Sequence, residues 1–131
     1  MSCEIDADYG NGPDAFKERH RTARKQHMCC ECNRLIEKGE KYLYESGIWE
    51  DEPKSFKTCV DYESVRNTFF CNHIYEMVWE DMEQLVYAYD GQLSAEKMAR
   101  LTPVARDRLC GLIDDYIKER AETDSEESHH A

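Results

Sequence analysis

A chain of 131 residues is long enough for one hydrophobic core, and its hydrophobic fraction of 40% argues against wholesale disorder. The formal net charge of -11, from 17 basic and 28 acidic residues, argues against a protein that coats DNA non-specifically. The start, MSCEIDADYG, has no signal-peptide pattern, and no apolar run reaches the length of a membrane span. We therefore expect a reducing compartment, in which the seven cysteines favour metal over disulfides.

The first part of the chain is predicted to be a flexible leader followed by a basic helix. Residues 1–13 carry acids, two glycines and a proline, which indicates the leader. Asp14 can cap a helix, and neither proline nor glycine interrupts the residues after it. Residues 17–25 carry five basic side chains and one acidic side chain. The basic side chains are those of Lys17, Arg19, Arg21, Arg24 and Lys25.

A β-hairpin and then helices are predicted in the remainder. Residues 41–49, KYLYESGIW, alternate between two faces as a strand does, and residues 54–59 return as a second strand after an acidic turn. A short helix begins at Cys59. Residues 74–89 and 103–117 each carry an apolar stripe at helical spacing. We expect these two helices to bury their apolar faces against each other.

Three cysteines have the spacing of a metal site. Cys29 and Cys32 form Cys-x-x-Cys, a spacing that lets two thiolates of one tight turn bind a single ion. Cys59 follows the hairpin at the start of the next helix, which is the order of a treble clef. A shared zinc would stabilise a hairpin that is too small to build its own core. The second pair is incomplete, because Tyr62 stands where a fourth thiolate is expected.

Several side chains are candidates for the fourth ligand. Cys71 would have to fold back toward Cys59, because an uninterrupted helix of twelve residues would carry it roughly 18 Å away. His73, His27 and Cys30 are alternatives, and a further alternative is that the site has lost its metal and the cysteines are small buried hydrophobes. The predicted zinc ligands are Cys29, Cys32, Cys59 and Cys71.

The expected fold class is α+β, with a treble-clef-like zinc-knuckle β-hairpin plus a C-terminal helical bundle. We expect a single domain over residues 14–121, in which residues 14–73 hold the basic helix, the knuckle and the hairpin, and residues 74–121 form the helical part. Residues 122–131 are acidic and are expected to be a disordered tail.

The pattern around the knuckle resembles small zinc-ribbon-like, treble-clef-type proteins that are encoded by bacteriophages and prophages. The resemblance covers roughly residues 15–85 and implies one zinc ion and a location in the cytoplasm of a bacterial host. A cysteine is usual in that family at the position of Tyr62. The matching residues are His27, Cys29, Cys30, Glu31, Cys32, Ile36, Gly39, Glu40, Tyr42, Gly47, Trp49, Lys57, Thr58, Cys59, Arg66, Trp79, Glu80 and Asp81.

Two charged segments are candidate contact surfaces. Residues 71–93 contain five acids and no base, and three of these acids, Glu76, Glu80 and Glu83, fall at i, i+4 and i+7. On one helix this row could mimic phosphates and occupy a basic groove of a partner, with Trp49 as an anchor. The competing surface is the basic helix, whose phosphate-binding candidates are Lys17, Arg21, Arg24 and Lys25. The alternative for each surface is a solvated face without a partner, with Trp49 packed within the hairpin.

The function expected from these observations is binding rather than catalysis. The chain has no Gly-rich phosphate loop, no H-E-x-x-H and no G-x-S-x-G. Charge and resemblance together favour a small acidic phage-type protein that binds and inhibits or redirects a host protein or nucleoprotein complex, including an anti-defence, anti-CRISPR-like role. The alternative is a zinc-finger nucleic-acid-binding or transcription-regulatory module that uses the basic helix. A homodimer is compatible with either function.

Overall fold

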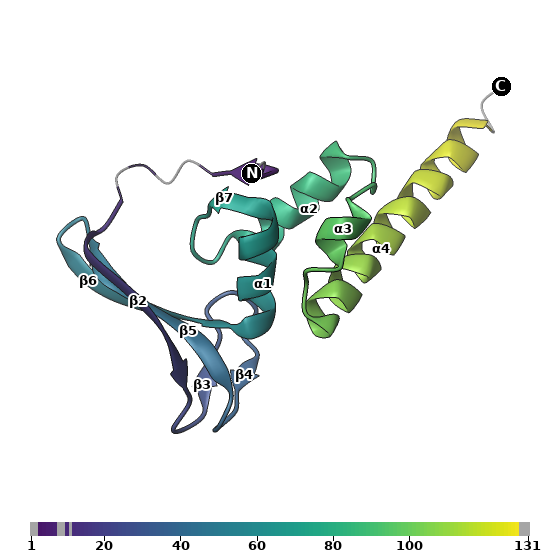
Figure 1. The fold of residues 1–131 in the computed structure, drawn as a ribbon. Coiled ribbons are helices and arrows are strands. Elements are labelled where there is room, and N and C mark those ends of the chain that lie inside the picture. Colours follow the sequence, from purple (N-terminus) through teal and green to yellow (C-terminus); the bar gives the residue numbers. More distant parts are fainter. Residues whose placement is uncertain (1–2, 8–9, 11, 129–131) are drawn as a thin grey trace.

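The computed structural model describes residues 3–7, 10 and 12–128 and combines strands with helices (Figure 1), which confirms the α+β class. The strands are β1 (Ile5–Asp6), β2 (Asp14–Thr22), β3 (His27–Met28), β4 (Leu35–Ile36), β5 (Lys41–Trp49), β6 (Glu52–Cys59) and β7 (Phe70–Asn72). The helices are α1 (Val60–Phe69), α2 (Val78–Ala88), α3 (Ala95–Met98) and α4 (Pro103–Ser128).

The predicted hairpin is present and consists of β5 and β6. The two strands are antiparallel and pair from Tyr42 with Cys59 to Trp49 with Glu52. Glu50 and its neighbour in the two-residue turn both have positive φ, which a tight turn between twisted strands requires. The alternating pattern that predicts β5 follows from this pairing, because successive side chains point to opposite faces of the sheet.

The basic helix predicted from Asp14 is wrong. Residues Asp14–Thr22 form β2, which pairs antiparallel with β5 and makes the sheet order β2-β5-β6. All nine residues of β2 are exposed, so no apolar face selects a helix there. The helix-favouring Ala, Lys, Glu and Arg side chains are overridden by the backbone hydrogen bonds that β5 offers along its free edge.

The cysteine knuckle lies in a second, small hairpin beside the sheet. β3 and β4 pair antiparallel, with His27 opposite Ile36. The backbone amide of Cys30 donates to the carbonyl oxygen of Lys57 at 2.8 Å, which ties the knuckle to the outer edge of β6. Gly39 has a φ of +94°, a conformation that glycine adopts without strain, in the turn that leads into β5. The knuckle is therefore fixed beside the strand that ends in Cys59.

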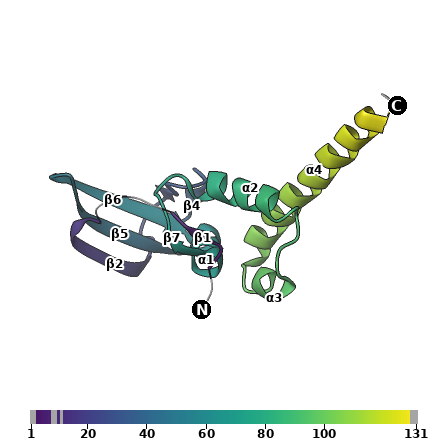
Figure 2. The same ribbon diagram turned by 90° about the horizontal axis from the view of Figure 1, so that it is seen from above.

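One core joins the sheet to the helices. Seen from above, α1 lies between the sheet and the helical part, and α4 projects away from the sheet (Figure 2). The predicted packing of the two apolar stripes is confirmed, since Met82 and Val86 of α2 and Leu109 of α4 are fully buried in a common core cluster. Leu112 is only partly buried, and Ile117 is 54% exposed, so the apolar stripe of α4 is covered only in part.

The predicted leader and the predicted tail both contain regular secondary structure. The leader is not wholly flexible, because β1 pairs parallel with β7, and Cys3 forms a disulfide with Cys71. The acidic tail is not disordered where the structure describes it, because α4 continues through Ser128. Residues 1–2, 8–9, 11 and 129–131 of the leader and tail lie outside the described residues. No described helix is both long and apolar enough to cross a membrane.

Candidate functional site

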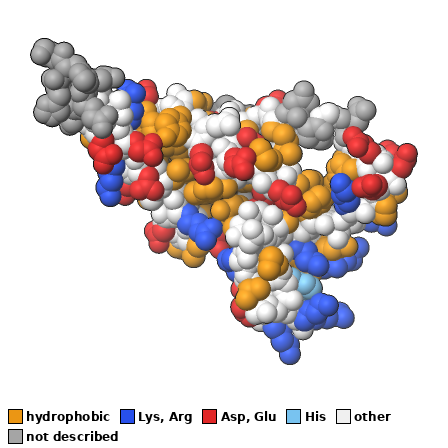
Figure 3. Space-filling view, turned by 180° about the vertical axis from the view of Figure 1, so that it is seen from behind, with side chains coloured by type: hydrophobic (Ala, Val, Ile, Leu, Met, Phe, Trp, Pro, Cys, Tyr) orange, Lys and Arg blue, Asp and Glu red, His pale blue; other side chains and the backbone are white. Residues whose placement is uncertain are grey.

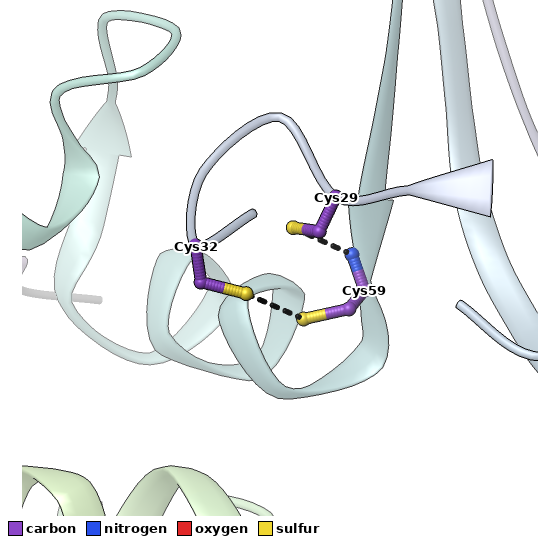
Figure 4. Close-up of side chains that lie close together, drawn as sticks. All are labelled: Cys29, Cys32 and Cys59. Carbon is purple, nitrogen blue, oxygen red and sulfur yellow. Dashed lines mark hydrogen bonds between the residues drawn. The ribbon is translucent and has the colours of Figure 1, made fainter. Parts of the chain in front are cut away.

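Three of the four predicted zinc ligands converge on one point. Cys29 and Cys32 come from the knuckle loop and Cys59 from the residue before α1, and their side chains point toward one another (Figure 4). Their sulfur atoms all lie within 4.8 Å of one another, and those of Cys32 and Cys59 are 3.8 Å apart. Thiolates bound to a tetrahedral zinc at about 2.3 Å are separated by about 3.8 Å, so this spacing fits zinc.

The surroundings of the three sulfurs favour one negative charge, which is held by Cys29. Cys29 and Cys59 are fully buried, and the backbone amide of Cys59 donates to the sulfur of Cys29 at 3.3 Å. Hydrogen bonds from the other two thiols, and then from backbone amides, lower the pKa of Cys29 to about 2. The hydrogen bond to the Cys29 thiolate raises the pKa of both Cys32 and Cys59. A divalent metal would supply the charge that releases those two protons.

Cys71, the predicted fourth ligand, does not join the cluster. α1 runs without a break from Val60 to Phe69, so it carries Cys71 to the opposite end of the helix, where the sulfur is bonded to Cys3. The other candidates are also placed elsewhere. Cys30 lies 3.7 Å from the hydroxyl of Thr58, the His27 ring contacts Tyr42, and the His73 ring contacts Tyr75.

Tyr62, which stands where a fourth thiolate was expected, is held away from a ligand role. The side chain is 4% exposed, and its ring lies against Trp79 at a centroid distance of 5.8 Å. Its hydroxyl accepts a hydrogen bond from Nη1 of Arg108 at 3.1 Å. Arg108 reaches the cluster from α4, so sequence spacing alone gave no signal of it.

Asp61 and Arg34 border the cluster and were not predicted. Nη2 of Arg34 lies 3.2 Å from Oδ2 of Asp61 and 3.2 Å from Oε2 of Glu40. The hydroxyl of Thr102 donates to Oδ1 of Asp61 at 2.6 Å. Two signals were visible in the sequence, because Asp61 lies in the first turn of α1 and Thr102 precedes the proline that starts α4. Their meeting depends on the fold.

The predicted row of three glutamates on one helix does not form. Glu76 lies before α2, in a turn with a φ of +71°, whereas Glu80 and Glu83 are exposed on the helix itself. The cause is Glu31, whose two carboxylate oxygens accept hydrogen bonds from the amides of Glu76 at 2.8 Å and Val78 at 3.2 Å. This carboxylate binds the free amides at the start of α2 and fixes the turn outside the helix.

Trp49 packs within an aromatic cluster and is not a fully exposed anchor. Its ring contacts those of Phe56 at 5.4 Å, Tyr75 at 5.7 Å and Phe16 at 6.3 Å, all edge to face. The rings of Phe56 and Tyr75 are stacked at 3.9 Å. Trp49 is half-buried, which favours hairpin packing over the predicted role in partner binding.

The basic side chains of β2 gather on one face of the sheet. Lys17 pairs with Ser46, Arg19 with Tyr44, and Arg21 with Tyr42, and paired residues share a face. The guanidinium of Arg21 lies 3.7 Å from the centre of the Tyr44 ring. We call this face the basic sheet face and define it by Lys17, Arg19, Arg21, Tyr44 and Lys57, which pairs with Tyr44 from β6.

The opposite face of the sheet carries α1. Glu45, which alternates with Tyr44 along β5, forms a bidentate pair with Arg66 of α1 through distances of 2.8 and 3.1 Å. Figure 1 shows the labelled helices on one side of the sheet only. Arg24 and Lys25, predicted with the basic helix, lie in the bend after β2. Burial, followed by the ammonium groups of Lys57 and Lys25, lowers the pKa of His27, which indicates a positive potential at this end of the face.

Charge is segregated along the molecule. Residues 14–59 carry ten basic and nine acidic side chains, whereas residues 60–131 carry seven basic and sixteen acidic ones. Figure 3 shows Lys and Arg side chains gathered at the sheet end, in the lower right of the view. Among the described acids, none forms an ion pair with Lys17, Arg19 or Arg21. The net charge of the whole chain therefore does not describe the basic sheet face.

Comparisons of the chain with protein-family models, with curated proteins and with solved structures find no match. The three-cysteine cluster and the basic sheet face are therefore the features that indicate a function.

Proposed function

We propose that this protein is a zinc-stabilised binding module that contacts the phosphate backbone of nucleic acid through its basic sheet face. The observation that supports this most directly is the register of β2 on β5. It aligns Lys17, Arg19 and Arg21 on one exposed face, where the guanidinium of Arg21 lies over the Tyr44 ring. Cations with free donors bind phosphate oxygens.

The proposed zinc has a structural part in this function. Cys59 is the last residue of β6, which pairs directly with β5, and its sulfur belongs to the three-cysteine cluster. A metal bound there would fix the knuckle, the start of α1 and the end of the sheet relative to one another. We propose no catalytic step for the module, because the basic sheet face offers positioning and charge but no paired acid and base.

The acidic half of the chain would restrict binding rather than prevent it. Phosphates approaching residues 60–131 meet an excess of acids, whereas those approaching the basic sheet face meet cations. The expected result is oriented and strongly salt-dependent binding, with the acidic helices turned away from the nucleic acid. With this orientation, a protein of net charge -11 can still bind nucleic acid through one basic face.

The experiment that tests the proposal is charge reversal on two surfaces. Arg19→Glu with Arg21→Glu should abolish binding to short labelled single-stranded and double-stranded DNA and to RNA, as measured by fluorescence anisotropy at low salt. Lys118→Glu with Arg120→Glu is the matched control on exposed positions of α4 and should leave binding unchanged. Equal binding by both variants, after circular dichroism shows that both are folded, would contradict the proposal.

A host-protein partner remains a second proposal, because Glu80 and Glu83 are exposed on α2 and the helical half is acidic. In this alternative the phage-type protein uses the remaining acidic surface to occupy a basic groove of a host complex. Glu80→Lys with Glu83→Lys should then abolish capture of that complex from a bacterial lysate treated with nuclease. The arginine pair described above should be dispensable for the same capture.

A further inference from the structure

The three-cysteine cluster has one side on which none of the described residues supplies a further ligand. A hollow of about 10 Å³ lies beside it, bordered by Cys32, Cys59, Arg34, Asp61, Tyr62 and Arg108. This volume is about what one water molecule requires. Val104, which also lines the hollow, is 52% exposed, so the hollow lies near the protein surface. A metal bound by the three sulfurs would lie next to this hollow.

The oxygen donors that border the hollow are already engaged. Oδ2 of Asp61 pairs with Arg34 at 3.2 Å, and Oδ1 accepts from Thr102 at 2.6 Å. The Tyr62 hydroxyl accepts a hydrogen bond from Nη1 of Arg108. Either side chain would have to break a partly buried hydrogen bond or ion pair to become a ligand, and such bonds are costly to leave unmade. These contacts keep all three oxygens away from a metal and leave the hollow open.

The charges around the hollow favour an anionic guest. Three thiolates and one zinc ion together carry one negative charge. Arg34 is already paired with Asp61 and Glu40, whereas no described acid forms an ion pair with Arg108, which also borders the hollow. A cation without an acidic partner, beside a soft, sulfur-rich metal centre, favours a small thiolate over a neutral ligand.

We propose that the metal bound by Cys29, Cys32 and Cys59 keeps an exchangeable fourth position, occupied by water and open to a small thiolate ligand. This inference rests on the zinc of the proposed function. On exchange, a thiol loses its proton to solvent, its sulfur bonds to the metal and the water leaves, so no oxidation occurs. Sites with three protein ligands and one open position are typical of reactive zinc, whereas structural sites have four protein ligands.

Cobalt(II) substitution tests the proposal, because sulfur-to-cobalt charge transfer reports the number of bound thiolates. The protein is loaded with cobalt(II) in buffer without thiols and titrated with 2-mercaptoethanol. The charge-transfer absorption should rise saturably by about one third, as the number of thiolates goes from three to four. No rise, or an absorption that already corresponds to four thiolates, would overturn the open position while leaving the metal in place. Failure to bind cobalt(II) or zinc at all would overturn both proposals.

Two variants separate an open position from an incidental response. Tyr62→Cys supplies the fourth protein thiolate, so its cobalt(II) spectrum should start at the higher absorption and should not respond to 2-mercaptoethanol. Arg108→Gln should keep the starting spectrum but weaken thiolate binding several-fold, and Arg120→Gln on the same helix is the matched control. If Tyr62→Cys fails to fold, the arginine pair still decides the matter, since equal thiolate affinity in both variants would contradict the role of Arg108.

Discussion

Arg66→Met should destabilise the protein strongly, because it leaves a buried carboxylate without its cation. The side chains of Arg66 and Glu45 are 10% and 2% exposed and are joined at 2.8 and 3.1 Å. After the change, the hydroxyl of Tyr75 at 2.8 Å is the remaining described side-chain donor to Glu45. Removing one partner of a buried ion pair costs about 3–5 kcal/mol, a large part of a typical total of about 5–15 kcal/mol.

Urea unfolding followed by circular dichroism would measure this loss, with zinc held at one concentration because bound metal adds to stability. Glu45→Gln combined with Arg66→Met is the matched control, since it removes both charges and nearly keeps the side-chain volume. We expect the double variant to be more stable than Arg66→Met alone by about 0.5–3 kcal/mol. A loss below about 1 kcal/mol in Arg66→Met, or a double variant no more stable than Arg66→Met alone, would refute the reasoning.

The pH dependence gives an independent check on the same pair. Burial raises the pKa of Glu45, but the hydrogen bonds and charge of Arg66 outweigh it and hold that pKa below its usual value of 4.5. A lowered pKa in the folded state means that the pair stabilises the protein above the unfolded pKa and less as pH falls. In Arg66→Met burial is opposed chiefly by Tyr75, so the pKa of Glu45 should rise above 4.5. The difference in stability between the variant and the original protein should therefore shrink as pH falls toward 4.5.

Three further outcomes are expected. Burial and the charge of Arg66 lower the pKa of His73 from 6.5 to about 4, so the protein loses up to about 3 kcal/mol of stability as pH falls from 6.5 to 4 and the buried ring gains a proton. His73→Phe should remove this loss, and urea unfolding at several pH values would measure the difference. Leu109→Ala should cost about 2–5 kcal/mol and more than Leu112→Ala in thermal unfolding, because only Leu109 is fully buried. Cys32→Ser should reduce the zinc content found by elemental analysis, whereas Cys110→Ser, at an exposed position, should retain it.

Local sequence patterns predict some elements of the fold but not others. The β5–β6 hairpin follows directly from alternation along residues 41–49, because one residue in two must face the same side of a sheet. The start of α4 follows from Thr102 and Pro103, whose preferences act within one turn. β2 does not follow from its own residues, which favour a helix. It is a strand because β5 has an edge to pair with, and the paired residues lie between 19 positions (Thr22 with Lys41) and 34 positions (Asp14 with Ile48) apart in the chain.

The candidate site likewise has features that follow from the sequence and features that depend on tertiary packing. The sequence by itself determined that Cys29 and Cys32 lie side by side, because one tight turn places both thiolates together, and it predicted Cys59 as their partner. Only the tertiary structure decided that Cys71 meets Cys3, since the length and direction of α1 separate it from the cluster. It also decided that acids and bases occupy different ends of the molecule and that basic side chains align on one face. Such facts depend on which distant segments pack together, and local spacing carries no record of that packing.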